Sequence, residues 1–366
     1  MHYQKNKKTI HKINPNEKVQ ISGAGPSGLA AAITLAQAGY KVVVHEAHHE
    51  VGFRFKQDLQ GIENWTQKED VLEEFSRLGI TTDFNFIPFK TGSSFDAWDN
   101  EYQLNCNKPF FYMVERGPGA GTLDNALLNQ ALSLGVEVRY NSRLEHIDGP
   151  GIFAGGPKVA DGLAVGYHFN TDMKNGFWII CDNKLSPKGY AYLLVMNGHG
   201  TVKSCMFSDY KHQKLYVQRT VAAFERLVGL KMINPQSHAG VDNFFIPTTA
   251  LQGNYPVVGE QAGFQDNLWG FGIRIAITSG VMAAYGIMGK SDYDAAWKKT
   301  LAPLMETSLV NRLIFSALGN KGYRWYLQHL HNQADIRQYL YKQYRPSFLK
   351  KLIFPLAKMV YRSHKK

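Results

Sequence analysis

A short segment near the N-terminus carries the residues best suited to bind a charged ligand. It contains an apolar run from Val19, a glycine-rich turn, and a stretch from Ser27 to about Ala38 that is predicted to be helical. In a GxGxxG turn the first glycine permits a tight bend, the second lets the backbone approach a pyrophosphate, and the third lets helix and strand pack closely. The helix N-terminus adds free N–H groups and partial positive charge. The turn residues that we assign to a dinucleotide are Gly23, Gly25, Pro26, Ser27 and Gly28.

Two charged residues follow at positions that suit the same ligand. A β-branched run from Val42 to Val44 ends at Glu46, whose carboxylate can accept hydrogen bonds from both hydroxyls of a ribose. Arg54 lies just beyond this strand, where a guanidinium can reach a phosphate or the adenine region. A turn whose glycines served packing alone would not need the acid at the strand end. The segment therefore predicts dinucleotide binding.

The same region holds several potential metal ligands. His45, His48 and His49 stand beside Glu46 and Glu50, but neighbouring residues at a strand end point in different directions and rarely converge on one ion. The three cysteines of the chain are widely spaced and form no CxxC pair. We therefore predict no metal site and a reduced environment without a disulfide framework.

Composition places the chain among globular proteins. Its 366 residues are 44% hydrophobic and 13% aromatic, enough for a sizeable core. No apolar run approaches the roughly 20 residues that span a bilayer, and the polar N-terminus has no secretory signal, so we expect a cytoplasmic location. The net charge is +11 and is concentrated at the two ends, but no nucleic-acid recognition motif accompanies it. Nucleic-acid binding is therefore not expected, and the oligomeric state is left open.

The middle of the chain alternates helical and strand-like patterns. Helices are predicted over 67–78, 123–134 and 217–230, because apolar residues recur there at helical spacing. Residues 80–114 and 167–225 instead alternate polar and apolar residues in short runs rich in Phe, Tyr and Ile, which is typical of antiparallel strands. The β-rich segments thus interrupt the nucleotide-binding part.

This order of elements resembles a known family. A dinucleotide turn, interleaved β-rich segments and a late strand–GE–loop–GFGI–helix sequence resemble the p-hydroxybenzoate hydroxylase-like flavoprotein fold, and are most similar to the geranylgeranyl reductase family. The resemblance covers about residues 19–290. It implies an α/β protein with α+β elements, in which a Rossmann-type FAD-binding domain is interleaved with a mostly antiparallel substrate-binding sheet and followed by a C-terminal helical region. The implied parts are a flexible basic leader (1–18), a discontinuous FAD-binding domain (19–79, 115–166 and 252–290), a substrate-binding domain (80–114 and 167–251) and the C-terminal region (291–366).

The resemblance also implies roles for single residues. Arg116 matches the arginine near the phosphate side of the flavin, and Gly259-Glu260 stands where the family has a Gly-Asp pair that binds the ribityl chain. A glycine-rich helix start matches the family's helix N-terminus beside the flavin N1 and O2, which stabilises an anionic reduced flavin. That helix start comprises Gly270, Gly272 and Ile273. The implied cofactor is FAD. Because the chain has no second GxGxxG, its reductant would be NAD(P)H docking transiently or an electron-carrier protein.

The substrate side matches less completely. The family's aromatic strand motif PxxYxWxFP falls on residues 187–195, where Pro187 and Tyr190 match but Tyr192 replaces the tryptophan and Leu194 the phenylalanine. Tyr190 and Tyr192 share one face of their strand and are our pocket candidates, although both would also suit a core. No catalytic residue is assigned. The paired-tryptophan signature of flavin halogenases is absent from the sequence, so halogenation is not expected.

Three functions are considered, the first two from the resemblance and the third from the basic C-terminal segment. The favoured one is an FAD-dependent oxidoreductase that reduces a C=C bond of a hydrophobic, lipid- or isoprenoid-like substrate by hydride transfer from flavin N5. The first alternative is a flavin-dependent monooxygenase of an aromatic or lipid-like substrate, because one fold supports both reactions. The second alternative is a non-catalytic flavin- or lipid-binding protein at a membrane.

The C-terminal tail supports a membrane partner. Residues 336–366 contain no acid, and within 346–366 apolar residues alternate with lysines. A basic amphipathic helix gains roughly 1 kcal/mol per Lys or Arg beside anionic lipid, in addition to apolar burial. Pro355 is expected to interrupt this helix, and its apolar residues could instead cap the folded domain. We therefore expect either a peripheral contact with the inner face of a membrane or a capping role.

Overall fold

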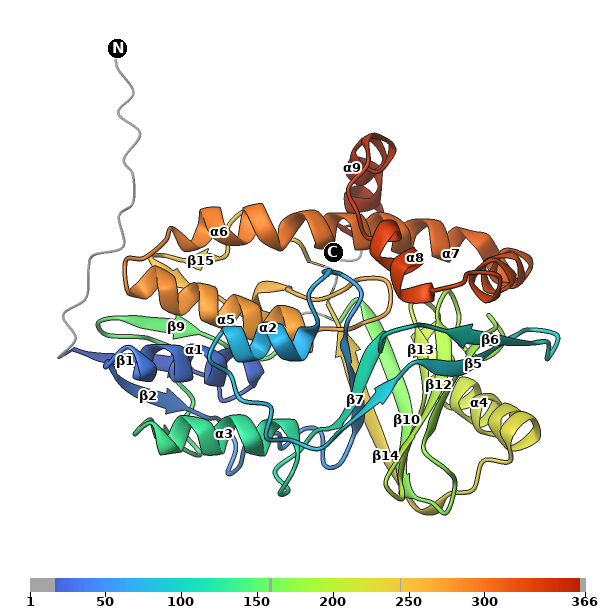
Figure 1. The fold of residues 1–366 in the computed structure, drawn as a ribbon, viewed down its shortest axis with the longest axis horizontal. Helices are drawn as coiled ribbons and strands as arrows, with labels where there is room; N and C mark the ends of the chain where they lie inside the picture. The colour runs from blue at the N-terminus through green and yellow to red at the C-terminus, as the bar shows by residue number, and fades with distance from the viewer. Residues whose placement is uncertain (1–16, 158–159, 244, 363–366) are drawn as a thin grey trace.

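The structure, a computed structural model, describes residues 17–157, 160–243 and 245–362. Most of the leader predicted for residues 1–18, and the last four residues of the tail, lie outside the described residues. Figure 1 shows three parts: a parallel sheet with its helices, a second body of long antiparallel strands, and a layer of C-terminal helices that extends over both. The prediction of a Rossmann-type unit interleaved with an antiparallel sheet is confirmed.

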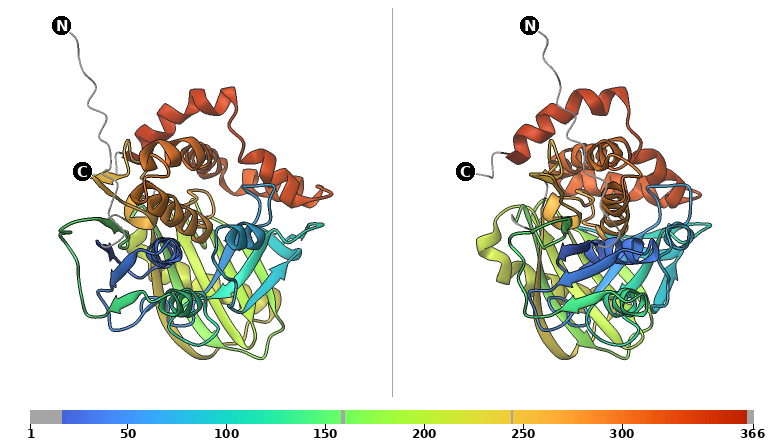
Figure 2. Two further views of the ribbon diagram at one scale, coloured as in Figure 1. Left: turned by 60° about the vertical axis from the view of Figure 1, so that its left-hand side comes forward. Right: turned by 90° about the vertical axis from the view of Figure 1, so that its left-hand side faces the viewer.

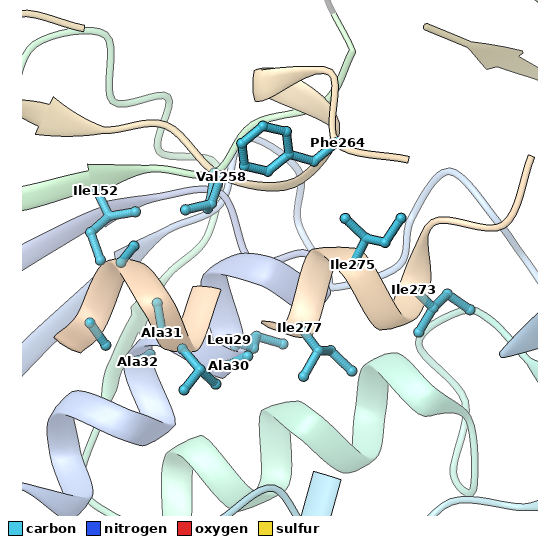
Figure 3. Packing of buried hydrophobic residues seen from close by; sticks show 14 of the residues in the cluster. Leu29, Ala30, Ala31, Ala32, Ile152, Val258, Phe264, Ile273, Ile275 and Ile277 are labelled. Atoms are coloured by element: carbon cyan, nitrogen blue, oxygen red, sulfur yellow. The ribbon is translucent and has the colours of Figure 1, made fainter. Parts of the chain in front are cut away.

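The parallel sheet carries the glycine-rich turn that is predicted to bind a dinucleotide. Its strands run in the order β8 (Glu137–Arg139), β2 (Lys41–His45), β1 (Lys18–Ser22) and β9 (Gly151–Phe153). Three helices form a stack beside it: α1 (Pro26–Gln37), α3 (Leu123–Ser133) and α5 (Ile273–Ile287). Figure 3 shows Leu29 and Ala30 of α1 close to Ile277 of α5, within one hydrophobic cluster. The approach requires small residues, because a Cβ on Gly280 of α5 would lie 2.1 Å from the Ser27 carbonyl oxygen.

Two further sheets form the second body. A small antiparallel sheet has the order β3 (Leu59–Glu63), β7 (Phe111–Glu115) and β4 (Phe86–Phe89). The large sheet has the order β14 (Ile233–Asp242), β10 (Gly162–Asn170), β13 (His199–Met206), β12 (Tyr190–Met196), β11 (Gly176–Cys181), β5 (Thr91–Asp96) and β6 (Glu101–Asn105). All of its pairs are antiparallel except that of β11 with β5. Helix α4 (Gln213–Val228) packs on β13 and β10.

Short elements connect these bodies. They are α2 (Val71–Arg77), the hairpin of β15 (Leu251–Gln252) and β16 (Tyr255–Pro256), and the 3₁₀ turns η1 (Tyr210–His212) and η2 (Gly259–Ala262). The C-terminal layer consists of α6 (Tyr293–Thr300), α7 (Ala302–His331), α8 (Ile336–Gln343) and α9 (Phe348–Arg362). Helix α7 bends at Gly319, whose φ of 60° is non-helical. Its first half packs in the core of the nucleotide-binding part, and its second half packs in the aromatic core of the second body.

Three expectations differ from the structure. The helix predicted over 67–78 spans only Val71–Arg77, because the Asp70 side chain accepts a hydrogen bond from the Leu72 amide and caps the helix there. The division predicted at 166/167 falls inside β10, which already pairs with its neighbours from Gly162. Pro355 does not interrupt the last helix, since α9 continues through it.

Candidate active site

One cavity of about 920 Å³ extends through the centre of the molecule. At one end it is lined by the β1–α1 turn and the end of β2. It continues past β3, the loop after η2 and the start of α5, and it ends among side chains of the large sheet, α7 and α8. Every residue assigned to the cofactor lies on its wall except Gly28 and Gly259, where an added Cβ would clash with the Gly23 carbonyl oxygen and the Ser27 side chain respectively. The remaining assigned residues are Gly23, Gly25, Pro26, Ser27, Glu46, Arg54, Arg116, Glu260, Gly270, Gly272 and Ile273.

The three fingerprint glycines have different surroundings. An added Cβ on Gly23 would lie 2.4 Å from the Ala154 carbonyl oxygen, and one on Gly28 would lie 2.0 Å from the Gly23 carbonyl oxygen. Both are therefore required by the protein's own packing. An added Cβ on Gly25 meets no protein atom within 4 Å. Gly25 thus leaves open the space that a pyrophosphate would occupy, which fits a bound dinucleotide.

The helix starts at this cavity also fit an anionic ligand. Helices α2, α3, α6 and α8 each begin at an Asp or Thr side chain that accepts a backbone N–H. Helices α1 and α5 begin at Gly25 and Gly272 with no side-chain cap, and both glycines line the cavity. Their first-turn N–H groups therefore retain donor capacity for phosphate oxygens at α1 and for a polar ring edge at α5.

Two acidic residues stand at the nucleotide end. Glu46 lies at the end of β2, where its carboxylate accepts hydrogen bonds from the Ala24 amide at 2.9 Å and the His48 amide at 3.0 Å. This holds it beside the glycine turn, in the position expected for a ribose partner. Glu260 forms an ion pair with Arg54 at 3.2 Å between residues 206 positions apart. The pair joins the segment after β2 to the η2 turn, so these two assigned residues act on the same part of the cavity.

Arg116 lies deeper and is fully engaged by protein groups. Its Nε and Nη2 donate to the two Asp124 carboxylate oxygens at 2.7 and 2.8 Å, and its Nη1 donates to Gln60 Oε1 at 2.8 Å. The guanidinium also stacks over Phe55, 4.1 Å from the ring centroid. Because Asp124 neutralises its charge, Arg116 supports the wall near the cofactor end by holding β7 to α3.

The far end of the cavity is aromatic and apolar. Trp65 and Phe271 meet edge to face with ring centroids 4.8 Å apart, and Phe111 lies 5.0 Å from Phe177. Further wall residues are Leu104, Phe110, Ile179, Leu194, Leu327, Leu330, Ile336 and Leu340. Such a surface favours an uncharged hydrocarbon-like ligand, since it offers few hydrogen-bond partners.

Both pocket candidates line this end. Tyr190 and Tyr192 lie on one face of β12, with ring centroids 6.2 Å apart. The Tyr190 hydroxyl donates to the Trp269 carbonyl oxygen in the loop before α5. Tyr192 pairs with Lys203 on the neighbouring strand β13. The sheet thus presents both side chains toward the loop that starts α5, while their part in chemistry stays a prediction.

A buried charged pair between the two ends was not predicted from the sequence. Lys203 Nζ lies 2.7 Å from both carboxylate oxygens of Asp58, and both residues line the cavity. Burial raises the pKa of the Asp58 carboxyl, but the charges of Lys203 and His238 and the hydrogen bonds from Lys203 and Gln60 hold that pKa below its usual value. The signal available in the sequence was a lysine in the middle of an apolar strand, VKSCMF, which requires a buried partner.

Several other ionisable groups lie on or near the cavity wall. Cys181 and Cys205 are on the wall, and burial raises the pKa of the Cys181 thiol to about 12, so it carries its proton. His168 stacks on His238 at 5.4 Å, and burial first, then neighbouring cationic groups, lowers the pKa of both imidazoles. His199 lies apart, 3.3 Å from Glu115. Within the described residues no group of three or more His, Cys, Asp or Glu side chains could hold a metal ion.

Comparison with known proteins agrees with this geometry. Residues 21–61 match the model of the NAD(P)-binding Rossmann-like domain. The digeranylgeranylglycerophospholipid reductase of Haloferax volcanii is 22% identical over an alignment 398 residues long, gaps included, that covers 88% of this chain and 91% of the relative. A geranylgeranyl bacteriochlorophyll reductase-like protein from Thermoplasma acidophilum superimposes with a TM-score of 0.74 at 17% identity, covering 93% of this chain and 99% of that one. This chain has the same fold as that reductase-like protein. The resemblance to geranylgeranyl reductases is thereby confirmed.

The same fold occurs in flavoproteins with other activities. The p-nitrophenol 4-monooxygenase of Pseudomonas putida has a TM-score of 0.55 at 14% identity, covering 87% of this chain and 98% of its own. A flavin-dependent halogenase has a TM-score of 0.62 at 15% identity, covering 92% of this chain and 69% of its own. These structures establish a shared fold across several chemistries, and the substrate has to be inferred from the cavity.

Proposed function

We propose that this protein is an FAD-dependent reductase that saturates a C=C bond in an apolar, isoprenoid- or lipid-like substrate. The observation that carries the proposal is the composition of the cavity, which joins a dinucleotide-binding end to an aromatic and aliphatic chamber. A relative of 22% identity along nearly the whole chain is a digeranylgeranylglycerophospholipid reductase, which is consistent with a substrate of this class. When bound, a reduced flavin would supply the hydride.

Residues at different places along the cavity would then have different roles. The N-terminal turn of α1, Glu46 and Arg54 would hold the dinucleotide, and the start of α5 would face the ring system. The aromatic end would exclude water and align a hydrocarbon chain through shape. Lys203 Nζ and the Cys181 thiol are proton-bearing groups on the wall, and either can provide the proton that must accompany a hydride.

The reductant is part of the proposal. The sequence contains a single dinucleotide fingerprint, which the FAD would occupy. NAD(P)H would therefore dock only transiently, or an electron-carrier protein would supply the electrons.

A monooxygenase is the second candidate. The fold shared with p-nitrophenol 4-monooxygenase favours it, because the same cavity would accept an aromatic substrate next to the flavin. A protein that binds flavin or lipid without catalysis is the third. Oxygen distinguishes the first two candidates: a monooxygenase consumes it in proportion to product, whereas a C=C reductase works anaerobically.

The test begins with the purified full-length protein and its visible absorption spectrum. Oxidised-flavin bands and FAD released on denaturation are expected. The reduced protein is then mixed anaerobically with a geranylgeranyl-containing lipid, and products are followed by mass spectrometry. A gain of two hydrogens per double bond, coupled to flavin reoxidation, supports the reductase. Product formed only with oxygen supports the monooxygenase, and a protein that binds no FAD would refute both.

A further inference from the structure

The last helix presents an unusual apolar surface. Among the described residues, five large apolar side chains are more than 60% exposed, and four of them lie in α9: Phe348 (79%), Leu349 (65%), Leu352 (62%) and Met359 (63%). Leu356, at 50%, lies between them. The spacing of 348, 352, 356 and 359 places these side chains on one face of the helix. A contiguous apolar face of this kind indicates a binding surface.

The opposite face of α9 already has a partner. Ala357 is fully buried, and Ile353, Phe354 and Tyr361 pack against the nucleotide-binding core. The Tyr361 hydroxyl lies 3.2 Å from Ser316 Oγ of α7. Figures 1 and 2 show α9 beyond α7, at the outer edge of the helical layer. The helix is therefore anchored by one side, and the exposed stripe faces away from the molecule.

The chain segment that carries this stripe has charges of one sign only. Residues 336–366 contain nine Lys or Arg and no Asp or Glu. Lys351 is exposed beside the apolar face, and Lys342 is exposed on α8. Lys350 instead turns toward the body, where its amino group donates to the Gln343 carbonyl oxygen, and Lys351 and Lys358 lie near the half-buried Glu306. The stripe therefore has the exposed Lys351 beside it and lies on a segment that carries basic but no acidic residues.

We propose that α9 docks this protein on the surface of an anionic lipid bilayer, with Phe348, Leu349, Leu352, Leu356 and Met359 inserted between the headgroups. Lys351, which is exposed next to these side chains on α9, would then lie at the level of the lipid phosphates. A second copy of the chain fits this surface less well, because an isologous contact would bring two purely basic helices together. None of the helices in the described ranges has the length and hydropathy for a bilayer span. Docking is thus peripheral, along the helix axis.

Docking would also place the cavity next to its source of substrate. Helix α8 contributes Ile336 and Leu340 to the apolar end of the cavity, and only residues 344–347 separate it from α9. An isoprenoid lipid would then pass from the bilayer to the aromatic chamber without crossing water. This last step rests on the proposed function, whereas the docking itself rests on α9 alone.

The test is flotation of the full chain with two kinds of vesicle. One kind contains phosphatidylcholine alone, and the other contains phosphatidylcholine with 30% phosphatidylserine. The wild type is expected to float with the anionic vesicles and to be released at high salt. Leu352→Glu should lower the bound fraction at least tenfold, and Lys351→Gln about fivefold, since one basic residue near the surface contributes about 1 kcal/mol. Ile233→Glu and Lys41→Gln make the same chemical changes at exposed positions away from α9 and should float like wild type.

The outcomes separate docking from catalysis. A wild type that fails to float, or a Leu352→Glu variant that floats equally well, overturns the docking. A dimeric wild type that becomes monomeric on Leu352→Glu, with no flotation of either, overturns it in favour of self-association. If the protein floats but reduces no lipid substrate, the docking proposal stands and the result counts against the proposed reaction. Leu352→Glu should keep its activity on substrate in detergent micelles and lose it on substrate in vesicles.

Discussion

Replacing Gly25 by valine is expected to weaken cofactor binding while the protein still folds. The backbone at Gly25 is extended, with φ −76° and ψ 177°, a conformation that valine adopts readily. Because an added Cβ meets no protein atom within 4 Å, the cost to the free energy of unfolding should stay near ~1 kcal/mol, the usual effect of a poorer N-cap residue. The same side chain would occupy the space that a pyrophosphate needs. Gly25→Val should therefore fold without FAD and fail to bind it.

The loss of affinity can be estimated from the contacts at stake. Displacing the pyrophosphate would break about two charge-assisted hydrogen bonds from backbone N–H groups at roughly 1.5 kcal/mol or more each. That corresponds to FAD binding at least about 100-fold weaker. At FAD concentrations 100 times the wild-type Kd, the wild type should gain ~2.7 kcal/mol of stability and the variant only ~0.4 kcal/mol.

Urea unfolding with and without FAD, combined with FAD titration by calorimetry, measures both quantities. Gly119→Ala is the matched control, since its Cβ would make one ordinary contact, with Thr122 Cγ2 at 3.7 Å, away from the cavity wall. Gly28→Ala is the opposite case, because its clash at 2.0 Å should destabilise the protein whether or not FAD is present. The reasoning is refuted if Gly25→Val binds FAD with wild-type affinity, or if it unfolds as readily as Gly28→Ala.

Three further predictions concern buried ionisable groups. Asp58→Asn leaves Lys203 charged and unpaired, and should lower the free energy of unfolding, measured in urea, by about 3–5 kcal/mol. The double variant with Lys203→Met should recover most of this free energy. A double variant that is as unstable as Asp58→Asn contradicts the pairing. Since the pKa of Asp58 is lowered in the folded state, its stabilisation is present above pH 3.8 and should fade as the pH falls below that value, less steeply in the double variant. Burial raises the pKa of Asp266 from 3.8 to about 6, so folding stability should decline as the pH rises between those values, and Asp266→Asn should remove this decline. With a pKa of about 12, the Cys181 thiol should resist iodoacetamide at pH 8 in the native protein and react after denaturation; rapid native labelling, located by peptide mapping, would argue against its burial.

The cofactor half of the site could be predicted because its signals are local. The turn from Gly23 to Gly28, the acid at the end of β2 and the glycine start of α5 each combine a backbone requirement with a nearby helix or strand. The α1, α3 and α5 helices were recognisable for the same reason, since their apolar spacing and glycine boundaries lie within a few residues.

The substrate half depends on contacts between distant segments. Asp58 meets Lys203 across 145 residues, and nothing in either local pattern specifies the other. The small sheet of β3, β7 and β4 was not anticipated, because its pairing joins a strand of the predicted FAD-binding part to strands of the predicted substrate part. Helix α2 was predicted too long since Asp70, inside the helical pattern, offers a cap that periodicity alone does not reveal.

The order in which the cavity is assembled has a consequence for biosynthesis. The glycine turn is made first, yet β9 at Gly151–Phe153 is needed to pair with β1, and α5 from Ile273 is needed to pack on α1. At about 5–20 residues per second, roughly 12–50 s separate the synthesis of Gly23 from that of Ile273. During that time the face of α1 that packs against α5 in the folded protein has no partner. We therefore expect FAD to bind only after most of the chain has left the ribosome.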